Sequence, residues 1–341
     1  MNEDRHPTGA GPHGASKLHL MTLLSVALNL GCTADQGQAA EQVVYPTRPI
    51  RLVVPWPPGG GADSAGRAVA QELTVALGRQ VIVDNRPGAA GIIGSEVVAH
   101  AQPDGYTLLL PTVTAGINPL FNRKLPYDTE QDFSPVILVA SSPYILTVNP
   151  AVAARSVAEL IGLAKAMPNQ LNYASTGNGS APHLTTEWFK MLTQTSIVHV
   201  PYKGGTPALA DLIGGQVQMA FGSIANYLPQ GRAGKVRMLA VTGAKRSPQA
   251  PDLPTMIESG VPGFVTGTWF GIQAPAGTPD LIVARLNAAL NKLLAAQDLP
   301  RRLALEGADP IGGTPREFAD FIKTELTRWA SVIRDAHISI D

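Results

Sequence analysis

The chain has 341 residues, which favours two lobes because a single hydrophobic core usually stops growing at about 250–300 residues. Lysine plus arginine and aspartate plus glutamate each total 26, so the formal net charge is zero. This balance excludes the broad basic field that attracts nucleic acid or an anionic membrane, so any ligand must be recognised locally. The single cysteine, Cys32, excludes a disulfide framework and a thiolate metal site.

The first 45 residues have the pattern of an export signal. Basic residues precede an apolar run over 18–30, and small and polar residues follow it. This run is shorter than the roughly 20 apolar residues that a transmembrane helix needs. We therefore expect an exported, soluble protein. Leu30-Gly31-Cys32 is similar to the end of a lipoprotein signal, but Asn29 stands where an aliphatic residue is usual, so lipid anchoring at Cys32 remains the alternative.

From Pro46 onward, short β-branched runs alternate with segments of helical periodicity, which predicts parallel sheets covered by helices. In the first lobe we expect strands over 50–54, 80–83 and 107–110. After the first strand and a glycine turn, apolar residues recur at three- and four-residue spacing and form one helix face. These residues are Ala65, Ala68, Val69, Leu73, Ala76 and Leu77.

A second lobe with its own sheet is expected in the middle of the chain. Its strands are predicted over 172–174, 197–200, 218–221 and 237–241, with helices near 181–192, 207–212 and 227–231. Capping boxes at Ser156 with Glu159 and at Thr314 with Glu317 mark two helix starts. Helices over 279–296 and 315–332 are expected to pack back on the first lobe, which puts the lobe crossings near 145–148 and 267–272.

The sharpest motif is the glycine-rich turn 57–63, between a predicted buried strand and an amphipathic helix. Three glycines without Cβ atoms let backbone amides approach a ligand, and the helix N-terminus adds unpaired donors and partial positive charge. The turn therefore predicts an anion site made by Pro58, Gly59, Gly60, Gly61 and Asp63. The alternative is a turn that only connects strand and helix, with Asp63 as the helix cap.

A second loop of this kind, 175–183, lies between a strand and a helix in the other lobe. One such loop in each lobe allows the two to close on opposite ends of a small anion. Hydroxyl groups there can donate to carboxylate oxygens without the cost of burying a cation. The candidate contacts are Ser175, Thr176, Gly177, Asn178, Gly179, Ser180 and His183. For His183, packing at the helix start stays open as the alternative.

Further candidates follow other predicted strands, at Thr112, Tyr202, Gly222 and Ser223. Open α/β sheets bind ligands at the carboxyl ends of their strands, where these residues are expected to lie. Lys203 offers an isolated counter-charge, although a solvated lysine is the simpler interpretation.

Signatures of catalysis are missing from the sequence. The first glycine loop lacks the Walker ending, because Arg67 follows Gly66 where the motif requires lysine, and it also lacks the third glycine of the dinucleotide fingerprint. There is no Gly-x-Ser-x-Gly elbow and no His-Glu-x-x-His helix. A triad of Asp63, His183 and Ser180 has no local signature. We therefore expect no enzyme activity, no cofactor and no metal.

Several longer motifs occur in order along the chain. They are Pro58-Gly59-Gly60-Gly61-x-Asp63, Asn85-Arg86-Pro87-Gly88-Ala89-x-Gly91, Pro103-Asp104-Gly105-Tyr106-Thr107, Gly177-Asn178-Gly179-Ser180, His199-Val200-Pro201-Tyr202-Lys203-Gly204-Gly205 and Trp269-Phe270-Gly271. With these motifs the sequence closely resembles the tripartite tricarboxylate transporter receptor family, the Bug solute-binding proteins, from about Pro46 to Ile338.

The resemblance implies an α/β chain with the type II periplasmic-binding-protein fold, in which two α/β lobes surround a hinge cleft. Residues 1–45 would be the export signal and a disordered N-terminal segment, 46–145 plus 268–341 the first lobe, and 146–267 the second. The resemblance also implies a carboxylate held mainly by main-chain groups, hydroxyls and ordered waters. The implied contacts are Pro58–Gly61, Asp63, Ser175–Ser180, His183, Gly222 and Ser223.

The implied function is that of a monomeric periplasmic receptor that delivers a small carboxylate to integral membrane permease subunits. The expected ligand is a di- or tricarboxylate, an aromatic acid or an amino acid. The family often has aspartate at the positions of Gln218 and Gly222, so their identity here disfavours an amino acid. Two alternatives stay open: a sensing module of the same fold that signals to a membrane receptor, and an enzyme in that fold.

Overall fold

The structure, a computed structural model, describes residues 44–121, 124–336 and 338. The expected export signal and the expected anchoring site at Cys32 lie outside these residues. Contacts group Tyr45–Asp341 as one unit. Within the described ranges, no helix has the length and apolarity of a membrane span.

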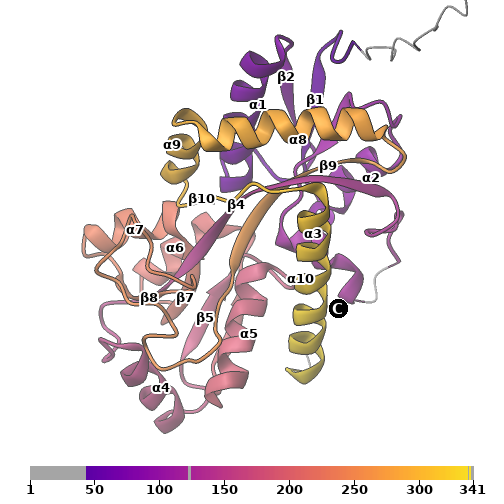
Figure 1. Cartoon of the computed structure of the whole chain (residues 1–341). Helices are drawn as coiled ribbons and strands as arrows, with labels where there is room; N and C mark the ends of the chain where they lie inside the picture. Colours follow the sequence, from indigo (N-terminus) through magenta and orange to yellow (C-terminus); the bar gives the residue numbers. More distant parts are fainter. Residues whose placement is uncertain (1–43, 122–123, 337, 339–341) are drawn as a thin grey trace, which may run out of the picture. The chain divides into compact units, whose positions relative to one another are not determined.

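One hydrogen-bonded path joins the strands in the order β2-β1-β3-β9-β4-β7-β5-β6, and β8 and β10 pair with β4 beside this path (Figure 1). The bounds are β1 (Ile50–Val54), β2 (Val81–Asn85), β3 (Thr107–Leu109), β4 (Phe133–Val148), β5 (Asn172–Ser175), β6 (Val198–Pro201), β7 (Met219–Ser223), β8 (Arg237–Val241), β9 (Gly267–Pro275) and β10 (Asp309–Pro310). The strands predicted from β-branched runs are confirmed, with ends that shift by at most two residues.

The strands of the second lobe pair with one another and with β4, as a second sheet predicts, but β4 also pairs with β9, so the two predicted sheets are joined into one path. Only the last residues of β4 were noticed in the sequence, as a lobe crossing. The reason is local: Pro135, Ser141, Ser142 and Pro143 interrupt the apolar run of this strand, and such residues ordinarily indicate turns. Pairing with β9 and β7 overrides that local preference.

Strand β4 changes its partner along its length. Its first part pairs with β9 as far as Pro143, opposite Gly267. From Tyr144, opposite Ser223, it pairs with β7, and from Ile145 it pairs also with β8. One continuous strand therefore belongs to both halves of the sheet. The predicted lobe limits fall near this change of partner and stay a prediction.

The predicted helices are present in the structure, some with longer bounds. They are α1 (Gly61–Leu77), α4 (Val157–Ala166), α5 (Ala181–Thr193), α6 (Gly205–Ile213), α7 (Ile224–Arg232), α8 (Asp280–Ala295) and α10 (Pro315–Asp335). Three further helices were not predicted: α2 (Ile92–Ala99), α3 (Val113–Ile117) and α9 (Asp298–Leu305). All three are short, so they carry little periodic signal.

The two predicted capping boxes differ in the structure. At α10, the Thr314 hydroxyl accepts the Glu317 amide and the Glu317 carboxylate accepts the Thr314 amide, so the box is complete. At α4, the Ser156 hydroxyl accepts the Glu159 amide, but the carboxylate of Glu159 accepts the amide of Arg155 instead. Both arrangements still satisfy orphan amides at the helix start.

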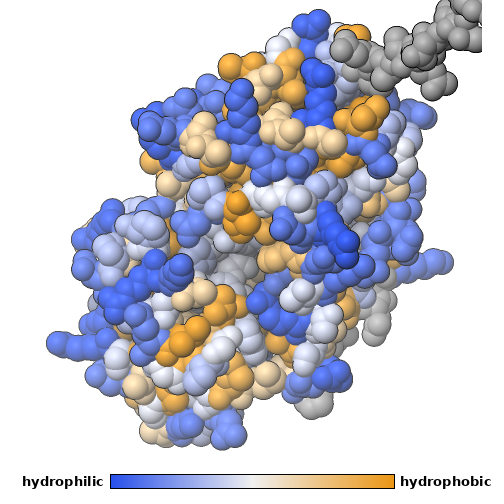
Figure 2. All heavy atoms as spheres, in the orientation of Figure 1, coloured by the Kyte–Doolittle hydropathy of each residue, from blue (hydrophilic) through white to orange (hydrophobic). Residues whose placement is uncertain are grey.

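The two long C-terminal helices, α8 and α10, both pack against β4. As expected, α8 packs against β4 and α1 in the first lobe, and Figure 1 shows it lying across the strands there. Helix α10 packs against β4 and α3, but also against α5 of the second lobe, so the prediction that it packs on the first lobe was only half correct. Its Trp329 is fully buried in the core that includes Phe189 and Phe264. Outside the core, hydrophilic residues cover much of the face seen in Figure 2.

The packing of α10 on the sheet leads to a test at Gly271. A Cβ atom at this position of β9 would lie 2.1 Å from Cζ of Phe318. We expect Gly271→Ala to lower the free energy of unfolding by about 1–3 kcal/mol, because a buried ring must move. Gly162→Ala is the control, since a Cβ there meets nothing within 4 Å and alanine favours a helix. Urea denaturation measures both variants, and an unchanged Gly271→Ala would contradict the packing.

Candidate functional site

The strand register places two predicted contacts, Thr112 and Ser223, near the level where β4 changes its partner. From the first lobe, Thr112 follows β3 and bridges to Phe270, which pairs with Ala140 of β4. From the second lobe, Ser223 at the end of β7 pairs with Tyr144. The two β4 positions are four residues apart, about 13 Å along a strand. Thr112 and Ser223 therefore lie at nearby levels of β4, beyond or at the carboxyl ends of their strands, where open α/β sheets bind ligands.

The first loop presents unpaired amides at the start of α1. Residues 57–61 are exposed. The amide of Gly59 donates to Asp63 Oδ2 at 2.9 Å and the amide of Ser64 to Gly60 O. In the described part of the chain, the amides of Gly60, Gly61, Ala62 and Asp63 have no acceptor. These donors point out of a helix N-terminus, where partial positive charge also attracts an anion.

Only one of the three glycines is required by the backbone. Gly59 has a φ of +84°, in the left-handed region that favours glycine. Gly60 has a φ of −90°, and a Cβ atom at Gly61 would meet nothing within 4 Å. The absence of side chains at Gly60 and Gly61 therefore serves no packing in the described chain and leaves the amides open to close approach.

Asp63 supports this loop from behind. It is 4% exposed, and besides the Gly59 amide it accepts Arg67 Nε and Asn85 Nδ2, both at 2.9 Å. The N-cap of α1 is Gly60, so Asp63 is not the helix cap of the alternative interpretation. Burial opposes the ionisation of Asp63, but hydrogen bonds from Arg67, Gly59 and Asn85 hold the pKa of its carboxyl below the usual value.

The second loop uses several of its own polar groups internally. The amide of Gly177 donates to Ser175 Oγ, and the hydroxyl groups of Ser175 and Ser180 bond to the carbonyl oxygen of Gly177. The amide of Gly179 donates to His183 Nδ1 at 3.1 Å. These bonds hold the loop in its conformation. They also occupy donors that were predicted from the sequence to bind the ligand.

Several other amides of the second loop have no acceptor. Thr176 and Asn178 are exposed. Their amides, and those of Ala181 and His183 at the start of α5, have no acceptor in the chain as described. The Thr176 hydroxyl has no partner there either. The second loop therefore repeats the chemistry of the first, with backbone amides as its main donors.

The other predicted contacts occupy distinct roles. The Tyr202 hydroxyl donates to Asp211 Oδ2 at 2.7 Å within its own lobe. Burial, together with this bond and the Asp211 charge, raises the pKa of Tyr202 to about 12. A Cβ atom at Gly222 would lie 1.9 Å from a ring carbon of Tyr227, so glycine is needed there to seat that ring. Thr112 is 5% exposed and precedes α3.

Comparisons with known proteins show the family of this chain. Residues 65–338 match the tripartite tricarboxylate transporter family receptor. The chain belongs to this family. The protein BugT of Bordetella pertussis is 37% identical over 320 residues, which cover 93% of this chain and 98% of BugT.

Two solved structures also resemble this receptor. R. palustris Rpa4515 with adipate is 40% identical, covers 86% of this chain and 99% of its own, and has a TM-score of 0.79. MatC from Rhodopseudomonas palustris with bound malate is 33% identical, covers 85% and 100%, and has a TM-score of 0.75. The expected periplasmic-binding-protein fold with two α/β lobes is confirmed.

Sequence reasoning missed three residues that bond to the predicted site residues. Arg67 and Asn85 hold the carboxylate of Asp63, and His199 Nε2 lies 2.6 Å from Ser175 Oγ. Arg67 had a findable signal, because it follows Asp63 by four residues on a predicted helix. Asn85 and His199 lie 22 and 24 residues away from their partners, and no periodicity connects them.

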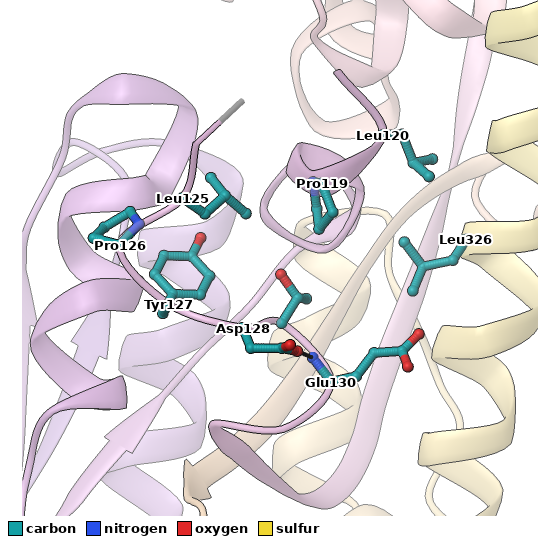
Figure 3. A pocket seen from close by; sticks show the side chains of 9 residues that line it. Pro119, Leu120, Leu125, Pro126, Tyr127, Asp128, Glu130 and Leu326 are labelled. Atoms are coloured by element: carbon teal, nitrogen blue, oxygen red, sulfur yellow. Dashed lines mark hydrogen bonds between the residues drawn. The ribbon is translucent and has the colours of Figure 1, made fainter. Parts of the chain in front are cut away.

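A cavity of about 720 Å³, lined by no residue of either loop, lies between the segments 119–120 and 125–130 on one side and helix α10 on the other. Its walls are formed by Pro119, Leu120, Leu125, Pro126, Tyr127, Asp128, Thr129, Glu130 and Leu326. Figure 3 shows the side chains of Leu125, Pro126 and Tyr127 facing that of Leu326 across it. The carboxylates of Asp128 and Glu130 at its wall repel an anion, so we place the site at the glycine loops instead.

The buried position of Asp63 leads to a stability test. We expect Asp63→Ala to lower the free energy of unfolding by about 1–3 kcal/mol at pH 7, because three donors lose their acceptor. Since the folded-state pKa of Asp63 is lowered, its contribution is present at neutral pH and disappears as the pH falls through that pKa. The difference in the free energy of unfolding between wild type and variant should therefore become smaller in acid.

Asp298→Ala is the control for this test, because the side chain of Asp298 is 65% exposed in its ion pair with Arg301. Its removal should change the free energy of unfolding by less than about 0.5 kcal/mol. Urea denaturation at several pH values measures both variants. An Asp63→Ala protein as stable as the wild type at pH 7 would argue against a stabilising role for the hydrogen bonds that Asp63 accepts.

Proposed function

We propose that this chain is a periplasmic receptor that captures a small dicarboxylate between its lobes and delivers it to integral membrane permease subunits. It does so as a non-catalytic monomer with no nucleic acid partner. The observation that carries the proposal is the set of unpaired amides at the start of α1, in an exposed glycine loop that follows β1. Membership of the receptor family supports the transport role.

The chemistry of the two loops fits a carboxylate at each end of the ligand. Each loop precedes a helix and offers several amides, so it can bind an anion by aligned dipoles without a buried cation. Arg67, the cation nearest the first loop, is committed to Asp63. Among the expected ligand classes, dicarboxylates gain support from relatives solved with adipate and with malate.

An amino-acid ligand fits less well. An ammonium group needs an acceptor that is free to receive it. Both oxygens of Asp63 already accept hydrogen bonds from this chain, and Gly222 has no room for an acidic side chain while Tyr227 occupies the adjacent space.

The arrangement of polar groups also supports a binding role over catalysis. In a catalytic triad, the histidine bonds the serine hydroxyl and the aspartate orients the histidine. Here the Ser180 hydroxyl donates to Gly177 O, and His183 Nδ1 accepts the Gly179 amide. Asp63 bonds only to residues of the first lobe. These bonds do not join Ser180, His183 and Asp63 into a triad.

Calorimetry of the purified protein tests the ligand class. We expect adipate or malate to bind with 1:1 stoichiometry and to raise the melting temperature, since a ligand at about 100 times its Kd adds about 2.7 kcal/mol of stability. Aspartate and benzoate should bind at least tenfold more weakly than the best dicarboxylate. If none of these acids binds, or if aspartate binds best, the proposed function is wrong.

The open glycine of the first loop gives a sharper test. We expect Gly61→Leu to weaken dicarboxylate binding at least tenfold, because a side chain there obstructs approach to the amides at the start of α1. The fold should tolerate it, since a Cβ at Gly61 meets nothing within 4 Å. Gly162→Leu, at an equally open helical glycine of α4, is the matched control and should leave affinity unchanged. Unaltered affinity in Gly61→Leu would place the ligand elsewhere.

A further inference from the structure

Three stacked rings contact the loop 175–180. The binding of a ligand by backbone amides does not explain why these rings are there. The rings of Tyr173 and His199 have centroids 4.8 Å apart, and those of His199 and His183 are 4.0 Å apart with planes at 8°. Both imidazoles also bond to the loop, His183 at the Gly179 amide and His199 at the Ser175 hydroxyl. The stack therefore supports the loop near both of its ends.

These bonds require an uncharged His183. Its Nδ1 accepts the Gly179 amide only when that nitrogen carries no proton, so the proton of the ring lies on Nε2. A proton on Nδ1 would set two N–H groups against each other. If His199 were charged as well, two cations would face each other at the stacking distance of 4.0 Å.

The charged neighbours of the pair do not supply a counter-ion. Glu187 is the acid nearest the stack, but it accepts Lys190 Nζ at 2.7 Å and the Tyr173 hydroxyl at 2.5 Å. Lys190 itself lies 5.6 Å from the centre of the Tyr173 ring and disfavours further positive charge. The groups that face the imidazoles therefore balance one another and leave the pair neutral.

The pKa values agree with this geometry. Burial, followed by the charge of Lys190, lowers the pKa of His183 to about 4. Burial, followed by the charge of His183, lowers the pKa of His199 to about 4, although the negative charge of Glu187 acts in the opposite direction. Because an unfolded imidazole titrates near 6.5, protonation opposes the folded arrangement as the pH falls from about 6.5 toward 4.

We propose that His183 and His199 are positioning residues of this receptor. The neutral, stacked pair holds the loop 175–180 in the form that presents the amides of Thr176 and Asn178. Protonation of the pair removes the acceptor of the Gly179 amide, releases the loop and weakens ligand binding. The binding part of this inference rests on the proposed function, whereas the charge and tautomer of the pair do not.

Nuclear magnetic resonance of the unliganded protein tests the pair directly. With labelled histidine, the ¹⁵N shifts of His183 should show the Nε2-protonated tautomer at pH 7, and both rings should titrate well below pH 6. His183→Leu should move the Gly179 amide resonance, whereas His183→Asn should largely retain it, because Asn Oδ1 occupies the place of Nδ1 and accepts. A midpoint near 6.5, or the opposite tautomer of His183, would overturn the proposal.

Calorimetry with adipate tests the effect on binding. At pH 7.5 we expect His183→Leu to weaken binding at least tenfold and His183→Asn to stay within about threefold of the wild type. Near pH 4 the wild type should lose about twofold or more relative to His183→Asn, since only the neutral fraction is competent and the protonation of adipate itself is common to both. His199→Leu and His199→Gln form the matching pair, and His100→Asn, at an exposed histidine, should change nothing.

The outcomes separate this inference from the proposed function. If the wild type binds no dicarboxylate, the proposed function fails, and the titration of the unliganded protein still decides whether the pair is neutral. If the wild type binds adipate and a folded His183→Leu binds equally well, the positioning role fails alone. If His183→Leu does not fold, two other measurements decide. They are the tautomer of His183 in the wild type and the pH dependence of adipate binding by His183→Asn.

Discussion

The pairing of strand β4 with two different sets of partners is the constraint on which the rest of the site depends. One strand of 16 residues pairs with β9 in the first lobe and with β7 and β8 in the second. Thr112, which follows β3, and Ser223, at the end of β7, therefore lie at nearby levels of this strand, one from each lobe. Helix α10 adds a second connection by packing on both β4 and α5.

Two ion pairs neutralise the acidic side chains that lie beside the glycine loops. Asp63 is paired with Arg67, and Glu187 with Lys190. The first pair lies under one glycine loop and the second beside the ring stack under the other. Desolvating a free cation or carboxylate is costly, whereas amides at a helix start are already oriented and lose little on binding. The arrangement suits a small anion that must be released again.

The glycines of the chain fall into two physical classes that the sequence does not distinguish. Gly222 and Gly271 are glycines because an aromatic ring, of Tyr227 or Phe318, fills the space that a Cβ would take. Gly61 has open space and an ordinary φ, so only access to its surroundings explains the missing side chain. The same residue type thus means packing in one place and ligand approach in another, and only neighbours distant in the chain decide which.

The sequence by itself determined the strands from β-branched runs, the helix starts from cap chemistry, the two glycine loops and the family, because each depends on residues adjacent in the chain. It did not show β4, whose prolines and serines favour turns until pairing overrides them. Only the tertiary structure decided which donors of the loops remain free. Asn85 reaches Asp63 and His199 reaches Ser175 from another strand, and such partners are set by the register of the sheet, which no local pattern encodes.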